Sequence, residues 1–374
     1  MKLAIATEQQ ELGDAVRRFL AARAPLSRVR ELMETPDGMD RAVWQQAGAQ
    51  LGLQGIAIPE EYGGAGFSFA EQAIVLEELG AALYGGPYLA SAVIAATALL
   101  SASDEAARRE LLPPIASGQA VATLAVTEDD GSWDPAAVRL TASPAAPGGG
   151  WILDGHKSFV LDGHTADLIL VVAATGSGLS LFGVHADAAG LSRRVLPTLD
   201  QTRKLARLEF RSVPAARLIG APGEAGAVLA RTLDVAAIAL AAEQLGGAQR
   251  ALDMAVGYAK TRHQFGRPIG SFQAIKHRCA DLLLEVSSLR SAVRYAAAAV
   301  AEDSAEIPVV AALTKAYASD VYFHVAAENI QIHGGIGFTW EHDAHLYFKR
   351  AKSSELFLGD ASYHRESLAQ RIGL

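Results

Sequence analysis

The sequence is poor in cysteine, in positive charge and in uninterrupted hydrophobic stretches. Its one cysteine, Cys279, excludes an intrachain disulfide and a cysteine-rich metal site, and we expect a buried structural thiol. The net charge of −8 argues against a general nucleic-acid-binding surface. No apolar stretch of membrane-spanning length lacks a charged or polar interruption, and the apolar run within residues 1–10 is too short for a signal peptide. These absences favour a cytoplasmic protein that spans no membrane.

Three consecutive parts of the chain differ in residue pattern. The 374 residues, half of them hydrophobic, suffice for two or three domains with buried cores. Residues 1–118 show helical periodicity, residues 119–221 alternate short apolar runs with turn residues, and residues 222–374 return to helical periodicity. We therefore predict the α+β class, with an N-terminal α-helical domain, a middle β-barrel or sandwich domain and a C-terminal four-helix bundle.

The first part carries signals of helix starts. Thr7, with Gln10 three residues later, resembles a capping box ahead of an amphipathic stretch. Further helices are predicted over residues 40–51, 88–100 and 104–116.

The middle part reads as short strands separated by glycine, proline, aspartate and serine. Residues 142–150 are rich in glycine and proline and are predicted to form an exposed hairpin or loop. The predicted strands cover residues 121–126, 138–141, 151–160, 168–173, 179–184 and 204–210.

The last part is dominated by a long, alanine-rich helical stretch over residues 224–262. At roughly 1.5 Å per residue such a helix is more than about 50 Å long. It is apolar on most faces, so we expect it to be buried in a bundle. The other helices predicted here cover residues 272–300, 308–332 and 343–358.

A loop interrupts this helical part between Tyr258 and Gln273. It carries Arg262 and Arg267, and Pro268 breaks the helix because its ring removes an N–H donor. Ser271 is a candidate N-cap for the helix that follows. Arginine forks match phosphate oxygens, so the loop suits a planar ligand that bears phosphate, although an ordinary helix corner is the alternative.

Three segments of the chain resemble motifs of the acyl-CoA dehydrogenase family. Residues 262–273 match RxQFGxPIxxFQ, residues 331–339 match QxxGGxGxT, and residues 58–66 match IPEEYGGxG. They occur in the family's order and spacing, and the resemblance extends over essentially the whole chain. It implies the family's three-domain fold and an FAD cofactor. The implied reaction is the α,β-dehydrogenation of an acyl-CoA in lipid β-oxidation, with electron-transferring flavoprotein as the expected acceptor.

The resemblance also implies which residues bind the pyrophosphate and adenosine end of FAD. In the family these elements commonly reach the flavin of a neighbouring subunit. The alternative for the glycines is an ordinary helix C-terminus. The residues that match are Arg262, Gln264, Phe265, Phe272, Gln273, Gln331, Gly334, Gly335 and Gly337.

The isoalloxazine end of the implied FAD site is less complete. Residues 155–163 resemble the family's GxKxWITNG, with Phe159 in place of the tryptophan, where it can still stack. Leu161 replaces the threonine whose hydroxyl supports the flavin N5 in the family, and leucine donates no hydrogen bond.

A second flavin-contacting segment, residues 126–134, resembles the family's TEPxAGSD in a shortened form. It keeps Thr127 and Ser132. Asp129 replaces the proline, and with Asp130 it is expected to place negative charge beside an electron-rich flavin.

The catalytic base is missing from both positions that the family uses. Leu358 occupies the place of the glutamate that usually precedes a Gly-Thr pair, and Ala236 occupies the place used by a second branch. Asp360, two residues beyond Leu358, is one replacement candidate. Glu243 is another, on nearly the same helix face as Ala236 but about 10 Å further along. A buried, paired structural glutamate is the alternative for Glu243.

Two interpretations of the chain remain open. In one, it is the base-lacking subunit of a heteromeric α2β2 dehydrogenase, similar to actinobacterial steroid or fatty acyl-CoA dehydrogenases, and a homologous subunit supplies the base and the flavin face. In the other, it is a self-sufficient, homo-oligomeric dehydrogenase with Glu243 or Asp360 as a displaced base. A flavoprotein that oxidises a substrate other than a CoA thioester is a third possibility.

Overall fold

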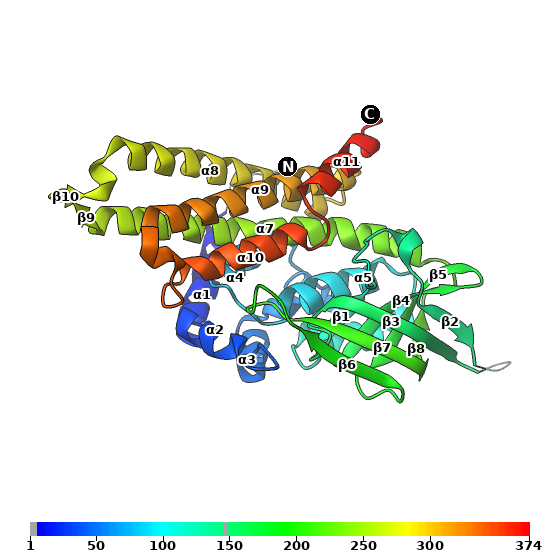
Figure 1. The fold of residues 1–374 in the computed structure, drawn as a ribbon. Coiled ribbons are helices and arrows are strands. Elements are labelled where there is room, and N and C mark those ends of the chain that lie inside the picture. The colour runs from blue at the N-terminus through cyan, green and yellow to red at the C-terminus, as the bar shows by residue number, and fades with distance from the viewer. Residues whose placement is uncertain (1–5, 146–148) are drawn as a thin grey trace. The chain divides into compact units, whose positions relative to one another are not determined.

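The chain folds into two compact units. The computed structural model describes residues 6–145 and 149–374 (Figure 1). The first unit, here named the helical unit, comprises Met1–Arg30, Phe69–Tyr84 and Ala237–Leu374. The second, here named the mixed unit, comprises Glu31–Ser68 and Gly85–Ala236.

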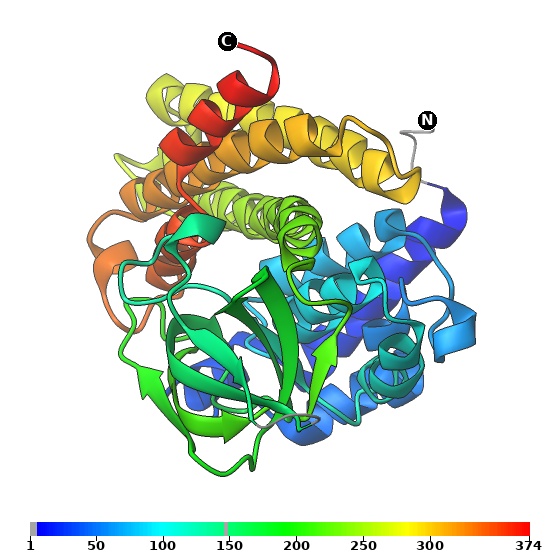
Figure 2. The ribbon, with the colours of Figure 1, turned by 90° about the vertical axis from the view of Figure 1, so that its right-hand side faces the viewer.

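Long helices dominate the helical unit. In Figure 2 helix α7 is seen nearly end-on, with α8 and α9 along one side of it. Helix α9 packs against α8, α10 and α11, while α4 packs against α1 and α8. The helices are α1 (Thr7–Arg23), α2 (Leu26–Met33, which continues into the mixed unit), α4 (Phe69–Ala81), α7 (Ala225–Thr261, which begins in the mixed unit), α8 (Gln273–Ala301), α9 (Ile307–His333), α10 (Ala344–Leu356) and α11 (Ala361–Arg371).

Glycines allow α4 and α7 to approach each other closely. A Cβ atom on Gly80 would lie 1.9 Å from the carbonyl oxygen of Glu243, and one on Gly246 would lie 1.7 Å from that of Glu77. No side chain fits at such distances, so both positions require glycine for this crossing.

The length and composition of α7 would allow it to cross a membrane. However, 67% of its most apolar 18-residue window is buried inside the protein. Such burial is typical of the core helix of a bundle.

The mixed unit combines short helices with a sheet. Its helical elements are α3 (Arg41–Leu51), η1 (Leu53–Gly55), η2 (Glu60–Tyr62), η3 (Tyr88–Ala95), α5 (Ala96–Ser101), α6 (Glu105–Ala116) and η4 (Pro135–Ala137). Its strands are β1 (Ala122–Ala125), β2 (Thr141–Pro144), β3 (Trp151–Leu161), β4 (Leu168–Thr175), β5 (Gly178–His185), β6 (Leu191–Leu196), β7 (Leu205–Pro214) and β8 (Arg217–Ile219).

The described strands of the mixed unit form an eight-stranded mixed sheet. Its order is β6-β7-β3-β2-β4-β5-β8, and β1 pairs in parallel with β4. A hydrophobic core joins the sheet to helices α5 and α6 through residues such as Leu99, Leu112, Ile115, Leu170 and Leu181. The alternating and fully apolar patterns of the strands produce this core because successive side chains point to opposite faces of a sheet.

The predicted α+β class is confirmed, with helices before and after a middle β region. The predicted strand over residues 138–141 is wrong, because β2 begins only at Thr141 and η4 precedes it. Two strands of the middle region were not predicted: β6 carries two arginines, and β8 is only three residues long. Of the predicted hairpin over residues 142–150, residues 146–148 lie outside the described residues.

Several local predictions need correction. The N-cap of α1 is Ala6, not Thr7, and the Gln9 side chain accepts a hydrogen bond from the Ala6 N–H. Ser271 does not cap α8, because it ends a short 3-10 turn and its hydroxyl is buried without a hydrogen-bond partner. Cys279 is half-buried rather than buried.

One predicted helix has an unexpected geometry. Residues 88–100 are helical as predicted, but Tyr88–Ala95 winds as a π-helix whose eight residues are all buried.

Candidate functional site

The loop between α7 and α8 is a tight β-hairpin. Strands β9 (His263–Gln264) and β10 (Arg267–Pro268) pair antiparallel. Phe265 and Gly266 form the turn with φ angles of 54° and 76°. Positive φ at both central residues is the signature of a type I′ turn, which suits a two-residue hairpin. The helix therefore ends at Thr261, ahead of the proline that was expected to break it.

Aromatic contacts fix the shape of this hairpin. The rings of Phe265 and Phe272 meet edge to face with centroids 6.1 Å apart. The Arg267 guanidinium lies 4.1 Å from the centroid of the Phe272 ring, in cation–π geometry. Arg267 is thus engaged within the hairpin, whereas the Arg262 side chain is exposed.

The groups that this hairpin presents to solvent suit a phosphate-bearing ligand. Arg262 forms no ion pair with any carboxylate of the described residues. Gln264 and Gln273 are also exposed, and Phe265 is 91% exposed. An unpaired arginine supplies a planar fork for phosphate, and an exposed ring supplies a stacking surface.

The second glycine-rich segment begins where α9 ends. Gly334 terminates α9 with a φ of 66°, and a 3-10 turn, η6 (Gly334–Phe338), follows. A Cβ atom on Gly334 or Gly335 would meet nothing within 4 Å, so the backbone there is open to a ligand. Gly337 is buried instead, with its Cβ position 2.8 Å from that of His333.

A stacked pair of rings ties the two segments together. Tyr258 near the end of α7 and His333 at the end of α9 stack with centroids 4.3 Å apart. The predicted site residues on both segments therefore belong to one end of the helical unit. Gln331 is exposed beside them. The donor set fits the pyrophosphate and adenosine end of FAD.

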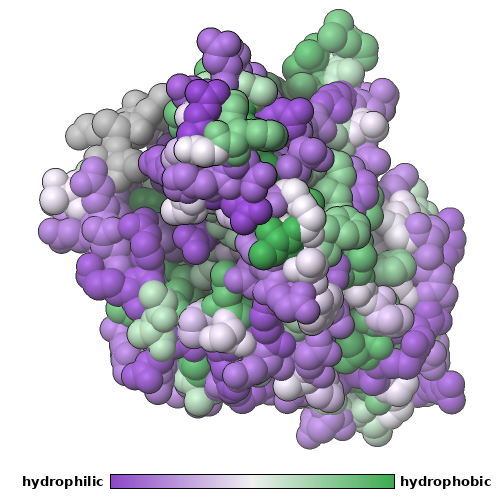
Figure 3. All heavy atoms as spheres, turned by 60° about the vertical axis from the view of Figure 1, so that its left-hand side comes forward, coloured by the Kyte–Doolittle hydropathy of each residue, from purple (hydrophilic) through white to green (hydrophobic). Residues whose placement is uncertain are grey.

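This end of the helical unit also exposes large hydrophobic side chains. Phe338 is 83% exposed, and Ile336 and Trp340 are each half-exposed. Figure 3, which brings the side carrying β9 and β10 forward, shows hydrophobic areas among hydrophilic ones. An exposed hydrophobic surface next to phosphate-binding groups is typical of a site that a second subunit completes.

In the mixed unit, a buried ion pair positions the predicted flavin-contacting loop. Lys157 of β3 is fully buried, and its Nζ donates to Glu128 at 3.0 Å and to the Val126 carbonyl at 2.7 Å. Glu128 also accepts from the backbone N–H groups of Arg139 and Leu140, both at 2.8 Å. Burial raises the pKa of Glu128, but these hydrogen bonds outweigh it and leave the pKa below its ordinary value.

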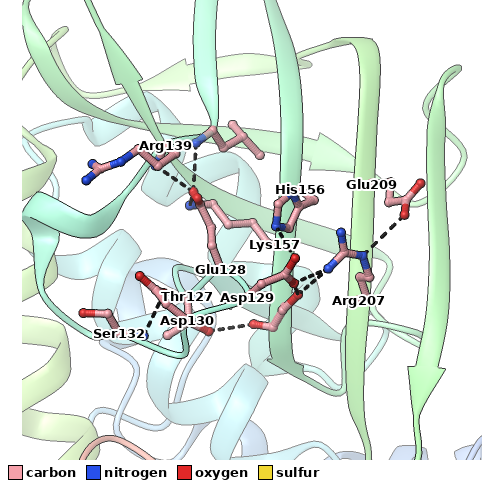
Figure 4. Close-up of polar contacts among 12 residues, drawn as sticks. Thr127, Glu128, Asp129, Asp130, Ser132, Arg139, His156, Lys157, Arg207 and Glu209 are labelled. Atoms are coloured by element: carbon pink, nitrogen blue, oxygen red, sulfur yellow. Dashed lines mark hydrogen bonds and ion pairs between the residues drawn. The ribbon is translucent and has the colours of Figure 1, made fainter.

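The negative charge expected at Asp129 is compensated. Figure 4 shows its carboxylate facing His156 and Arg207. Asp129 accepts a hydrogen bond from Ser158 Oγ at 2.6 Å and a charge-assisted one from Arg207, and His156 Nε2 lies 3.1 Å away. The Ser158 hydrogen bond, with Arg207 and His156, lowers the pKa of Asp129. Asp129 therefore keeps its negative charge but is paired within the mixed unit, and the Asp130 carboxylate accepts a hydrogen bond from the Ser132 N–H at 3.0 Å.

The remaining predicted flavin contacts are mostly engaged within the mixed unit. The Thr127 hydroxyl is buried and donates to the Ser158 carbonyl at 2.6 Å. The Ser132 hydroxyl accepts from the Asp134 N–H at 3.2 Å. Phe159 lies at an irregularity of β3 with a φ of 59° and remains 39% exposed, so it can stack on a ligand. Leu161 is buried and offers no polar side-chain atom.

The loop that carries the base in this family is held firmly here, but without a base. Leu358 is 4% exposed and has a φ of 64°. Its carbonyl lies 2.9 Å from His364 Nε2, and the carbonyls of Gly359 and Glu355 accept hydrogen bonds from the fully buried Lys315. Burial, with the Lys315 charge, lowers the pKa of His364 to about 4.

Each candidate for a displaced base has a structural partner. Glu243 is buried and forms an ion pair with Arg350 at 2.8 Å. Asp360 is the N-cap of α11, where its side chain accepts from the Tyr363 N–H at 2.8 Å. Ala236 is buried on α7 and has no ionisable group. Neither carboxylate is placed as an unengaged base.

Some of the residues that shape these sites were not predicted from the sequence. Lys315 and Arg350 come from elements far along the chain from the groups they contact, whereas His364 lies six residues beyond Leu358. The only sequence signal was the presence of charged residues within apolar helical patterns, which suggests paired burial without naming the partner. Within the described ranges, no cluster of three His, Cys, Asp or Glu side chains could hold a metal ion.

Comparisons with known proteins agree with this architecture. Family models described as the N-terminal, middle and C-terminal domains of acyl-CoA dehydrogenase match residues 6–119, 123–213 and 225–373. Helices, a β region and further helices with an FAD-type corner define a flavin-dependent oxidoreductase. The chain belongs to the acyl-CoA dehydrogenase family, whose members use FAD to dehydrogenate acyl-CoA substrates.

Three known proteins illustrate the similarity. The acyl-CoA dehydrogenase IpdE2 of Mycobacterium tuberculosis is 39% identical over 351 residues, covering 94% of this chain and 93% of its own. A chain of the ChsE4–ChsE5 complex from the same species matches with a TM-score of 0.90 and 32% identity. The match covers 100% of this chain and 99% of that chain. A variant of the steroid ACAD Tcur3481–Tcur3483 matches with a TM-score of 0.88 and 34% identity. The match covers 99% of this chain and 98% of that chain.

When FAD is bound, it supplies the acceptor for the hydride in this reaction. The matching residues of this chain would bind and orient the cofactor. Arg262 would hold the pyrophosphate. The open backbone at Gly334 and Gly335 would hold the adenosine end. Among the predicted flavin contacts of the mixed unit, the exposed ring of Phe159 is suited to stacking.

Proposed function

We propose that this chain is the base-lacking subunit of a heteromeric acyl-CoA dehydrogenase. Its exposed Arg262 hairpin contributes to an FAD site at the interface. A homologous partner subunit supplies the catalytic base and the residues that contact the isoalloxazine ring. The observation that carries the proposal is Leu358, a buried hydrophobic residue at the end of a well-supported base loop. A loop that is held by hydrogen bonds but has no catalytic carboxylate is consistent with a subunit that does not itself catalyse the reaction.

The state of the other carboxylates supports the same proposal. A general base must be free to take a proton from the substrate. Glu243 is held by Arg350, and Asp360 is held by the first turn of α11. In a self-sufficient enzyme, the base would have to act while engaged in one of these interactions.

The similar proteins suggest the kind of partner and substrate. ChsE4–ChsE5 is described as a complex of two chains, and Tcur3481–Tcur3483 as a steroid ACAD. We infer an assembly of this chain with a homologous acyl-CoA dehydrogenase, a fatty or steroid-derived acyl-CoA as substrate, and electron-transferring flavoprotein as the acceptor. A cytoplasmic location is part of the same proposal.

The ratio of flavin to protein tests this function. The chain is expressed alone and together with the acyl-CoA dehydrogenase encoded beside it, and FAD content and acyl-CoA-dependent flavin bleaching are measured. We expect little flavin on the chain alone, and about one FAD per two chains with activity in the complex. Near one FAD per chain, with bleaching by acyl-CoA in the absence of a partner, would overturn the proposal.

A further inference from the structure

The helical unit contains a cavity whose lining includes none of the predicted FAD-binding residues and neither candidate base. It has a volume of about 650 Å³. Ligand sites typically have about 300–1,000 Å³, so this volume suits a small organic molecule. Its walls come from α1, the start of α2, α4, α7, α8 and α10.

Small side chains create the space. One face of α1 presents Ala21 and Ala24, and α4 presents Ala81 and Ala82. The close crossing at Gly246 brings α4 and α7 together at one edge of the cavity. Leu20 and Leu26 add larger apolar surface, so the body of the cavity is hydrophobic.

The acidic groups on the rim of the cavity are already neutralised. Glu78 accepts two hydrogen bonds from Arg17, at 2.6 and 3.0 Å. Glu77 is paired with Arg290, and with Arg294 at 2.5 Å.

The remaining acid at the rim, Asp253, accepts a hydrogen bond from Gln249 at 2.8 Å. Asp253 is exposed and keeps its negative charge, because its partner is a neutral amide, whereas Glu77 and Glu78 are paired with arginines.

Arg250 differs from the other arginines of the cavity. It is exposed, and among the described residues it has no carboxylate partner. Its guanidinium lies beside the Tyr347 hydroxyl, which donates to the Ala81 carbonyl at 2.7 Å. Burial raises the pKa of Tyr347 to about 12, so this hydroxyl stays neutral and adds no competing charge.

We propose that this cavity binds a small monocarboxylate with an apolar body. The carboxylate would pair with Arg250, the one cation of the cavity that lacks an acidic partner among the described residues, and the apolar body would cover Leu20, Ala21 and Ala82. The site contains none of the predicted FAD residues and neither base position. Its occupancy is therefore independent of the proposed role of the chain in dehydrogenation.

Calorimetric titration of the co-expressed complex tests the site with two matched probes. Octanoate and octan-1-ol share the alkyl chain and differ in the charged head group. We expect saturable binding of octanoate at millimolar concentrations, and binding of octan-1-ol that is at least about tenfold weaker. Equal binding of the two probes, or no saturable binding of octanoate, would overturn the proposal.

Variants locate the binding event. Arg250→Gln removes the charge from an exposed side chain, and Ala21→Phe fills the cavity from an exposed position. Each is expected to weaken octanoate binding by about tenfold or more. The controls Arg18→Gln and Ala22→Phe change neighbouring exposed residues of α1 outside the cavity and should leave binding unchanged.

Two further measurements keep the variants interpretable. Melting curves without octanoate establish that each variant is folded. FAD content reports separately on the proposed function, so loss of flavin and loss of octanoate binding can be distinguished. Octanoate binding that is the same in Arg250→Gln, Ala21→Phe and the wild-type complex would place the ligand elsewhere and reject the site.

Discussion

Glu243 of α7 and Arg350 of α10 form a buried ion pair with an N–O distance of 2.8 Å. Both side chains are almost completely removed from solvent. A buried charge is tolerated only when it is paired and hydrogen-bonded, so each residue explains the presence of the other. The glutamate seven residues beyond the base position at Ala236 is thus explained by the stability of the bundle.

Glu243→Gln should therefore reduce stability rather than turnover. The amide can still accept a hydrogen bond, but the Arg350 charge loses its counter-charge, and we expect a cost of about 3 kcal/mol. Urea denaturation measures this cost, and steady-state kinetics of the heteromeric complex should give a kcat within about threefold of wild type.

The control for Glu243→Gln is Glu328→Gln, which breaks the more exposed ion pair with Arg278. Such surface pairs contribute at most about 1 kcal/mol. If Glu243→Gln lowers kcat by more than about two orders of magnitude in a folded complex, Glu243 is a working base and the partner-subunit proposal fails.

Arg262→Ala should weaken the retention of FAD. The exposed guanidinium has no carboxylate partner among the described residues, so its removal costs the fold little. Loss of a charge-assisted phosphate contact is expected to weaken cofactor binding about tenfold or more. The flavin-to-protein ratio after gel filtration measures the effect.

Lys260→Ala is the matched control for Arg262→Ala, since it removes an exposed cation two residues earlier on the last turn of α7. It should leave the flavin content unchanged. An equal loss in both variants would indicate a general electrostatic effect, and no loss in either would remove Arg262 from the FAD site.

The sequence predicted what depends on local pattern and on motif. The helices and most strands followed from periodicity, because the burial of one face requires apolar residues at regular spacing. The clustering of the two glycine-rich segments followed only from the resemblance to a family. In the structure it rests on the stacking of Tyr258 and His333, which are 75 positions apart in the sequence and share no local signal.

The details that the sequence could not give are long-range pairings. The sequence indicated the negative charge of Asp129 but not its partner, because Arg207 lies on a strand far along the chain. Ser271 looked like a cap, yet the hairpin directs the helix to begin at Gln273. The π-helix at Tyr88–Ala95 has no recognised sequence signature in this chain.

Acid should destabilise the helical unit in part through His364. Burial, with the Lys315 charge, holds the pKa of the folded state at about 4, below the ordinary value of about 6.5. Between these values the unfolded chain binds a proton that the folded chain does not, so stability falls as the pH drops from 7 to 4. The full contribution is about 3 kcal/mol.

His364→Gln should remove this part of the pH dependence. The glutamine amide can still donate to the Leu358 carbonyl, but it does not titrate in this range. Urea denaturation at pH 7 and at pH 5 gives the two free energies of unfolding. We expect a smaller difference between the two in the variant than in the wild type, and an identical difference would show that His364 titrates normally.

Gly246→Ala should be among the most damaging single substitutions in the helical unit. The new Cβ would lie 1.7 Å from the Glu77 carbonyl oxygen, so α4 and α7 would have to separate. Because backbone cannot rotate away as a flexible side chain can, we expect a loss of about 3 kcal/mol or more in the free energy of unfolding.

Gly257→Ala is the control on the same helix, where a Cβ meets nothing within 4 Å. There the gain in helix propensity should stabilise the protein by about 0.5–1 kcal/mol. Opposite signs for the two substitutions in one thermal denaturation series would show that the crossing, and not helix propensity, accounts for Gly246. Since Gly246 also lines the proposed monocarboxylate cavity, a folded Gly246→Ala variant should change octanoate binding, whereas Gly257→Ala should not.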